Sequence, residues 1–263
     1  MSKEIEAKNE RYTIQSIDKA LDLLELLAEH GSLSLIEITN LLEQPKSSTF
    51  RIILTLENRG FISRSDEDGK YCLGYKQLML TRNLLERNTL RTAALAEMKR
   101  LSERYGDTVN LGVLIDNQVL YIEIVESTHA LRMTDTIGSR SPFHATAMGK
   151  AIAAFIPETA VRELVNMWGL PAITHNTIRT VEQLLSELGH IRKQGYALDD
   201  EEIVEGARCV AAPVFDMHRR PIGAISVSGA MHRFKEELLP EISQHVREAA
   251  SIASQKLGYL AGT

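Results

Sequence analysis

The sequence has few cysteines, no long apolar run and no excess of positive charge. Its 263 residues include two cysteines, Cys72 and Cys209, which lack the spacing of metal ligands. This favours a reducing cytoplasm over a disulfide-stabilised secreted protein. The longest uncharged apolar run, residues 151–156, is too short to cross a bilayer, and residues 1–12 are rich in charge. We therefore expect a cytoplasmic protein without a membrane partner.

The net charge of −5 does not indicate a nucleic-acid partner, so any such function must depend on local charge. Residues 1–75 have an acidic excess, but within them residues 45–64 carry four Lys or Arg side chains against Glu57 alone. A chain of 263 residues, 44% of them hydrophobic, can bury a core in one large or two smaller domains.

The N-terminal pattern predicts three helices and a hairpin. Apolar residues have helical spacing over 17–28, and Ser34 and Glu37 have the spacing of a capping box for a short second helix. A third helix should run over 45–60, because proline is tolerated in a first helical turn. The stretches FISRS and KYCL flank DEDG and predict a hairpin with Gly69 in its turn. The third helix is expected to bury Phe50, Ile53 and Leu54.

This order of elements is typical of a winged helix-turn-helix domain, whose third helix would present its first turn to DNA. Helix N-termini attract phosphate, hydroxyl groups fix the register on it, and the major groove admits a helix. The alternative is an ordinary helical hairpin with a solvated polar end. The expected DNA-binding residues are Lys46, Ser47, Ser48, Thr49 and Arg51 on the helix and Arg64 on the hairpin.

The second half of the chain predicts an α+β sensor-like domain. The helical stretch 75–106, with a break near Asn88, should contain a linker helix and the first helix of this domain. Strands, then helices, then strands follow, and one early strand is expected at LRMTDTIG, residues 131–138. The expected divisions are a charged arm at 1–12, the winged domain at 13–75, the linker helix at 76–88 and the sensor-like domain at 89–263, which the family resemblance described next makes an effector-binding domain.

The sequence resembles the IclR family of bacterial transcription regulators over nearly its whole length. The blocks SIDKALDLLELL, PKSSTFRIILTLENRGFI, FHATAMGKA and GAISVSG carry this resemblance in the right order. The most specific match is to the spacing of the family's effector-domain signature, which here consists of Gly195, Asp199, Glu202, Cys209, Val210, Ala211, Val214, Phe215 and Asp216.

The resemblance implies a winged helix-turn-helix domain joined by a linker helix to a GAF-like mixed α/β effector-binding domain, in a dimer or a dimer of dimers. It implies a sequence-specific regulator that binds double-stranded operator DNA, a repressor in preference to an activator, under the control of a small organic acid. No cofactor is implied. The positions that match the family's effector pocket are Ala147, Met148, Asp199, Cys209, Ser226 and Ser228.

The chemistry of these positions suits such a ligand. The hydroxyls of Ser226 and Ser228 and the backbone amides at the start of the AMGKA helix could bind a small acid. An ionised Asp199 would accept a hydrogen bond from a ligand hydroxyl or order the pocket. Some relatives have a smaller side chain at the position of Met148. The methionine of this chain should therefore narrow the pocket. The alternative is that Cys209 and the serines are ordinary buried strand residues.

A metabolite-binding enzyme with an accessory helical domain is the competing prediction. A phosphate-binding loop would need Gly at position 144 and Ser or Thr at 151, where the chain has His144 and Ala151. Ser226 and Ser228 lack the flanking glycines of a nucleophile elbow. We therefore expect no catalytic residue and no metal site, with His144 as a structural hydrogen-bonding residue. A pure oligomerisation scaffold, a third class, would not need the polar third helix.

Overall fold

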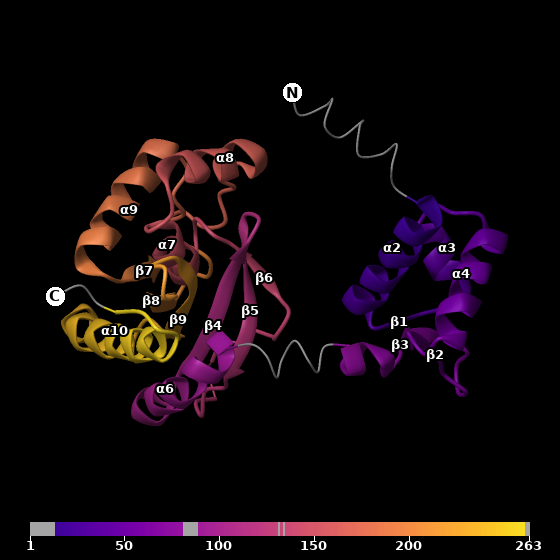
Figure 1. The fold of residues 1–263 in the computed structure, drawn as a ribbon, viewed down its shortest axis with the longest axis horizontal. Coiled ribbons are helices and arrows are strands. Elements are labelled where there is room, and N and C mark those ends of the chain that lie inside the picture. Colours follow the sequence, from indigo (N-terminus) through magenta and orange to yellow (C-terminus); the bar gives the residue numbers. More distant parts are fainter. Residues whose placement is uncertain (1–13, 81–88, 131, 134, 261–263) are drawn as a thin grey trace. The chain divides into compact units, whose positions relative to one another are not determined.

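The structure, a computed structural model, describes residues 14–80, 89–130, 132–133 and 135–260 (Figure 1). The chain divides into two compact units, Met1–Arg87 and Asn88–Thr263. The expected arm at 1–12 and positions 81–88 of the expected linker lie outside the described residues. No described helix is both long and apolar enough to cross a membrane.

The first unit is a winged helix-turn-helix fold, which confirms the prediction. Its elements are α2 Gln15–His30, β1 Ser32–Leu33, α3 Leu35–Leu41, α4 Lys46–Asn58, β2 Ile62–Arg64 and β3 Tyr71–Leu73. The strands form an antiparallel sheet in the order β1-β3-β2. Gly31, with φ 75°, caps α2, and the Ser34–Glu37 capping box is present at the start of α3. The core contains Leu23, Leu27, Leu33, Ile38, Ile53, Ile62 and Tyr71.

Helix α4 buries a different face from the one predicted. Thr49 and Ile53 are fully buried, whereas Phe50 is 39% exposed and Leu54 is 38% exposed. Residues four apart share a helix face, so Thr49 and Ile53 form the inward stripe and Phe50 and Leu54 are rotated away from it. Burial of Thr49 is tolerated because its hydroxyl donates a hydrogen bond of 3.3 Å to the Pro45 carbonyl. The predictions that Phe50 and Leu54 are buried and that Thr49 points outward are wrong.

The second unit is built on one antiparallel sheet of six strands, in the order β6-β5-β4-β9-β8-β7. Its strands are β4 Thr108–Ile115, β5 Gln118–Val125, β6 Arg140–Pro142, β7 Ala197–Asp200, β8 Ala207–Phe215 and β9 Pro221–Ala230. Its helices are α6 Thr89–Tyr105, α7 Ala147–Ala153, α8 Glu158–Trp168, α9 Val181–Gln194 and α10 Leu239–Lys256, the last preceded by the 3-10 turn Glu236–Leu238. The expected mixed α/β domain is confirmed.

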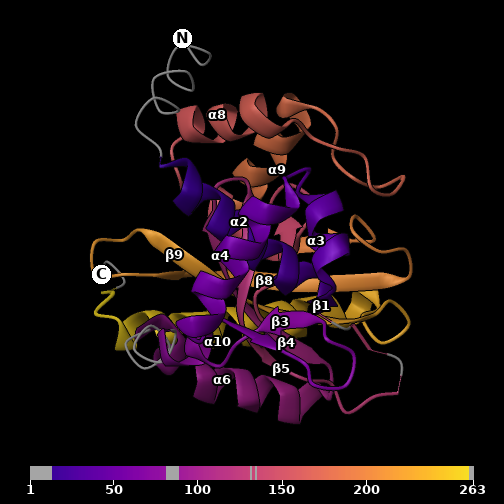
Figure 2. The ribbon, with the colours of Figure 1, turned by 90° about the vertical axis from the view of Figure 1, so that its right-hand side faces the viewer.

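Helices cover both faces of this sheet (Figures 1 and 2). Helices α6 and α10 pack on one face over residues such as Val210 and Val227, and α7 and α9 pack on the other over Ala211 and Ala224. Because strand side chains alternate between faces, Ser226 and Ser228 point to the α7 face and Ile225 and Val227 point to the α10 face. The two cores therefore lie on opposite sides of β8 and β9.

One expected strand is not present where it was predicted. The described residues of the stretch 131–138 form no strand, and β6 begins later, at Arg140. The alternation of LRMTDTIG indicated a strand, but the segment instead carries polar side chains across to β4: the Asn110 amide donates to Asp135, and Thr108 donates to the Met133 carbonyl. Local alternation was overridden by these tertiary contacts.

Gly149 should be indispensable for the placement of α7. A Cβ added at Gly149 would lie 2.2 Å from the backbone oxygen and 2.4 Å from the Cα of Phe143, neither of which can move without shifting the chain. Gly149→Ala should therefore lower the free energy of unfolding by about 2 kcal/mol or more, a typical cost of overpacking. Gly189→Ala in α9 is the matched control, because its added Cβ meets nothing within 4 Å. It should stabilise by about 0.5–1 kcal/mol. Denaturant titration of both variants measures the difference, and equal effects would contradict the packing.

Candidate functional site

The N-terminal turn of α4 offers polar groups and no competing negative charge. Pro45 is the N-cap and provides no side-chain hydrogen bond, and the first turn contains no acidic residue. Lys46, Ser47 and Arg51 are exposed, and Ser48 is partly buried. Since the first backbone amides of a helix lack intrahelical acceptors and carry partial positive charge, this end of α4 suits a phosphate group.

Thr49 does not belong to this exposed surface, because its side chain is fully buried in the domain core. Phe50 does belong to it, with 39% of its surface exposed between Ser47 and Leu54. The four-residue spacing of Thr49 and Ile53 could have indicated the buried face of α4. A pattern of apolar residues alone does not show it, because one of the two residues is a threonine. The exposed face of α4 consists of Lys46, Ser47, Phe50, Arg51, Leu54, Thr55 and Asn58.

Arg64 is exposed on the hairpin but is partly held by its own wing. Its Nε donates to the Gly69 carbonyl at 3.1 Å, and its guanidinium carbon lies 5.5 Å from the centre of the Tyr71 ring. These contacts orient the side chain at the tip of the hairpin and leave its other nitrogen donors available.

In the second unit, strand register brings the predicted pocket residues together. Asp199 pairs with Cys209, and Cys209 pairs with Ser228, so these three side chains form one row across β7, β8 and β9. Ser226 pairs with Asn110 of β4 in the next row on the same face. Directly opposite residues in antiparallel strands point to the same side, which places this polar group under α7.

All six predicted pocket residues line one small cavity between the sheet and α7. Its volume is about 30 Å³, which is roughly the space of one or two water molecules. Sequence reasoning missed the other lining residues, because the resemblance does not mark them and several lie outside regular strands. The full lining consists of Tyr121, Met133, Asp135, Thr146, Ala147, Met148, Asp199, Ile203, Cys209, Ser226 and Ser228.

Burial dominates the electrostatics of the cavity. It raises the pKa of Asp199 to about 6, although the backbone amide of Glu202 donates to Asp199 Oδ1 at 2.8 Å. Burial also raises the pKa of Asp135, against the effect of its hydrogen bond from Asn110. The pKa of the Cys209 thiol is raised well above its ordinary value, mainly by burial, so Cys209 is not an activated nucleophile.

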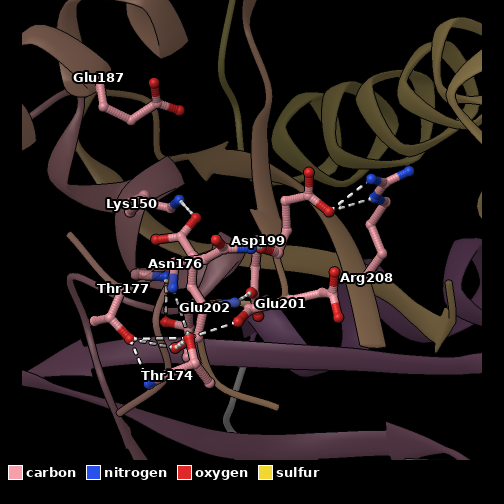
Figure 3. A network of polar contacts seen from close by, with 12 residues as sticks. Lys150, Thr174, Asn176, Thr177, Glu187, Asp199, Glu201, Glu202 and Arg208 are labelled. Carbon is pink, nitrogen blue, oxygen red and sulfur yellow. Dashed lines mark hydrogen bonds and ion pairs between the residues drawn. The ribbon is translucent and has the colours of Figure 1, made fainter. Parts of the chain in front are cut away.

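A buried ion pair joins α7 to the turn that follows β7 (Figure 3). Lys150 contacts Glu202 through Oε1, and their side chains are only 1% and 9% exposed. Burial raises the pKa of Glu202 to about 7, and the Lys150 ammonium opposes this shift. Lys150 of the GK pair is therefore engaged inside the protein and is not placed to bind a phosphate.

Two threonine hydroxyls also hold this turn in place (Figure 3). Thr177 Oγ1 donates to the Glu202 carbonyl at 2.7 Å, and Thr174 Oγ1 donates to the Glu201 carbonyl at 2.6 Å. Asp200, the last residue of β7, is ion-paired with the buried Arg208. Asp199 is thus fixed on both sides along the chain, which presets its carboxylate at the cavity.

Met148 fills the space beneath α7 and limits the size of the cavity. It is 2% exposed, and a Cβ added at Gly112 of β4 would lie 3.2 Å from its sulfur and from its terminal carbon.

His144 Nε2 lies 3.1 Å from the Pro171 carbonyl, and burial lowers its pKa, so it has the structural role expected of it. Within the described residues, no group of His, Cys, Asp and Glu side chains is arranged to hold a metal ion.

Comparisons with known proteins agree with this geometry. The family profile "IclR helix-turn-helix domain" matches residues 16–66, and "Bacterial transcriptional regulator IclR C-terminal" matches residues 82–255. The transcriptional repressor IclR of Escherichia coli is 37% identical over 240 residues, which are 90% of this chain and 88% of that protein. The crystal structure of Thermotoga maritima IclR is 33% identical with a TM-score of 0.77, covering 94% of this chain and 100% of that chain. An IclR homologue from Microbacterium hydrocarbonoxydans, complexed with 4-hydroxybenzoate, has the same fold at 24% identity with a TM-score of 0.83, over 92% of this chain and 98% of that chain.

A winged helix-turn-helix unit that matches a helix-turn-helix family profile, in a chain whose relatives are named transcriptional repressors and regulators, defines a DNA-binding transcriptional regulator. The chain belongs to the IclR family of bacterial transcriptional regulators. The relatives are regulators of transcription, so the alternative of an enzyme has no support.

The raised pKa of Glu202 should make stability depend on pH. Between about pH 5 and pH 7 Glu202 is protonated to a larger extent in the folded protein, where its pKa is about 7, than in the unfolded chain, where it is near 4.5, so the ion pair with Lys150 is complete only above this window. The free energy of unfolding should therefore fall as pH rises through this window, with Glu202 contributing about 1–3 kcal/mol. Glu202→Gln should be less stable than the wild type above about pH 7, where the ionised Glu202 of the wild type pairs with Lys150, and its stability should depend less on pH.

The control for this measurement is Glu163→Gln, since Glu163 is an exposed residue of α8. In urea titrations at pH 5, 6 and 7, the free energy of unfolding of this variant should depend on pH as that of the wild type does. A Glu202→Gln variant with the wild-type pH dependence would show that Glu202 titrates at its ordinary pKa.

Proposed function

We propose that the protein is a cytoplasmic repressor that reads an operator through the exposed face of α4 and is controlled by a small organic acid bound in the cavity beneath α7. The observation that carries this proposal is the cavity itself, which gathers hydroxyl and carboxyl groups from β7, β9 and the chain around α7 into a buried space. The E. coli relative is named a transcriptional repressor, which supports repression in preference to activation.

On the DNA, the exposed residues of α4 have distinct chemical roles. Lys46 and the first amides of the helix would contact phosphate, and Arg64 would contact a neighbouring phosphate from the hairpin. Arg51, Ser47 and Ser48 would read base edges, since arginine and serine both form hydrogen bonds in the major groove. Phe50 joins this set as an apolar side chain that suits a thymine methyl group. Thr49 is left out because its side chain is buried.

Lys46 and Arg51 should differ in their effects on DNA binding. Lys46→Ala should weaken binding to all duplexes and lower the slope of log affinity against log salt by roughly one unit. Arg51→Ala should cost about 1–3 kcal/mol on the specific site and much less on scrambled DNA. Fluorescence anisotropy with a duplex selected by the protein from a random library, beside its scrambled version, distinguishes the two.

Lys193→Ala provides the control, because Lys193 is an exposed lysine on α9 of the second unit. It should leave both affinities unchanged. Wild-type binding by Lys46→Ala and Arg51→Ala alike would remove α4 as the recognition helix.

Self-association is part of the proposal, as a homodimer or a dimer of dimers. One recognition helix covers too little DNA for a tight specific site, and a two-fold symmetric pair doubles the contact. The operator should accordingly be an inverted repeat. Light scattering should give at least twice the monomer mass of 29.4 kDa, both free and with DNA added. A stable monomer in both states would refute this.

In the cavity, Ser226 and Ser228 provide hydroxyl groups to a ligand carboxylate, and Asp199 accepts a hydrogen bond from a ligand hydroxyl. The homologue from Microbacterium hydrocarbonoxydans is complexed with 4-hydroxybenzoate, a small acid with one hydroxyl. In this chain, the hydroxyl and carboxyl groups that line the cavity support such a ligand. Met148 favours a compact ligand, and it must rotate or shift for the ligand to enter.

Ser226→Ala with Ser228→Ala should abolish ligand control and spare DNA binding. The two functions lie in separate compact units, so control requires two states of the protein with different ligand affinity, and a coupling of about 1–3 kcal/mol would suffice. Titration calorimetry with small hydroxy acids, beside a DNA titration, tests both halves. Ser186→Ala, at an exposed position of α9, should behave as wild type. Loss of ligand-free DNA binding in the double variant would instead make the serines structural.

A further inference from the structure

Asn110 and Asp135 line or border the cavity and were not among the residues that the sequence indicated. Asn110, on β4, is 1% exposed. Its amide nitrogen lies 3.3 Å from Asp135 Oδ2 and 3.4 Å from the Ser228 hydroxyl. Asp135 lies between β5 and β6 and forms part of the cavity lining. The two residues therefore connect the sheet floor of the cavity to its wall.

The side-chain oxygen of Asn110 is unsatisfied. It is buried and has no hydrogen-bond donor among the residues that the structure describes. A buried carbonyl oxygen without a donor is costly, and such atoms in native proteins call for an explanation. A ligand hydroxyl in the adjacent cavity would supply the missing donor.

The charges of the cavity also favour donors. Asp135 and Asp199 both line it, from different segments of the chain, and none of the described lining residues is Lys, Arg or His. Lys150 is buried nearby but is paired with Glu202. An unsubstituted carboxylic acid would bring negative charge to two carboxyl groups and would leave Asn110 without a donor, whereas hydroxyl groups can donate to the acids and accept from the serines.

We propose that Asn110 and Asp135 form a second hydroxyl-recognition point, and that the effector is a small polyhydroxylated acid with at least two hydroxyl groups. One hydroxyl donates to Asp199, and another donates to Asp135 beside the Asn110 amide, while the carboxylate faces the serines. This rests on the proposed function of the cavity as the effector site. The second recognition point would make the cavity select hydroxylated acids over acids of the same length without hydroxyl groups.

The test measures how much each added hydroxyl improves binding to the full-length protein. Propanoate, lactate and glycerate have three carbons and zero, one and two hydroxyl groups, and butanoate and threonate extend the series by one carbon. Titration calorimetry on the wild type should show a roughly ten-fold fall in Kd from lactate to glycerate, as expected for a hydrogen bond to a charged acceptor. In Asp135→Asn this step should shrink to less than about three-fold, while the step from propanoate to lactate, assigned to Asp199, is retained.

Asp116→Asn is the matched control, because Asp116 is exposed in the turn between β4 and β5 and its φ of 55° is one that asparagine also adopts. It should reproduce every wild-type step. Thermal unfolding of Asp135→Asn confirms that the variant is folded, and Asp135→Ala should give the same loss of the second step. A full lactate-to-glycerate step in either folded Asp135 variant would overturn the role of this residue.

Further outcomes separate this inference from the proposed function. If the acids bind the wild type with affinities independent of hydroxyl number, and the Ser226→Ala, Ser228→Ala variant loses them, the cavity is the effector site but the hydroxyl specificity is wrong. Tighter binding of serine than of glycerate would likewise overturn it, in favour of an ammonium group at Asp135. If no acid binds the wild type, or if the Ser226→Ala, Ser228→Ala variant binds all the acids as the wild type does, the proposed function fails together with the inference.

Discussion

The pairing of β4 with β9 is the constraint on which the second unit depends. It joins the strands β6-β5-β4 to β9-β8-β7 and sets Thr108 opposite Ser228 and Asn110 opposite Ser226. A slip of one residue would turn both serines toward α10 and put Ile225 and Val227 into the cavity. The same register therefore specifies the apolar core on one face and the polar cavity on the other. The cavity needs no dedicated structural element, because it is the polar part of a face that otherwise packs on α7.

Among the described residues, two buried side-chain atoms near the cavity lack a hydrogen-bond partner. Lys150 and Glu202 neutralise each other, and threonine hydroxyls hold the turn that contains Glu202. Asn110 Oδ1 and Glu202 Oε2 are among the four buried side-chain atoms without a hydrogen-bond partner in the described part of the chain. Asn110 lies beside Ser228, and the Glu202 amide binds Asp199. Incomplete satisfaction close to a cavity is typical of a binding site, where a ligand completes the set.

In the first unit, the rotation of α4 about its axis decides which residues face solvent. The Thr49 hydroxyl donates a hydrogen bond to the Pro45 carbonyl, so this side chain can be buried with Ile53 in the core. Its burial turns Phe50 outward, next to Ser47 and Arg51. A helix that combines exposed cations, hydroxyl groups and an aromatic ring offers contacts for phosphates, base edges and thymine methyl groups together.

The sequence by itself indicated most of the helices and strands in their order, the family and the six residues that line the cavity. Capping signals such as Ser34 with Glu37, the short and mainly apolar stretches of β8 and β9, and ordered family blocks are local, so they can be read along the chain. Only the tertiary structure decided the buried face of α4, the absence of a strand in the described part of 131–138, and the meeting of Asn110 with Asp135. These three features depend on contacts between residues that are distant in the sequence, or on which face of a helix packs against the rest of the domain. Local spacing does not contain that information, because the free energy of burial is set by the partner surface.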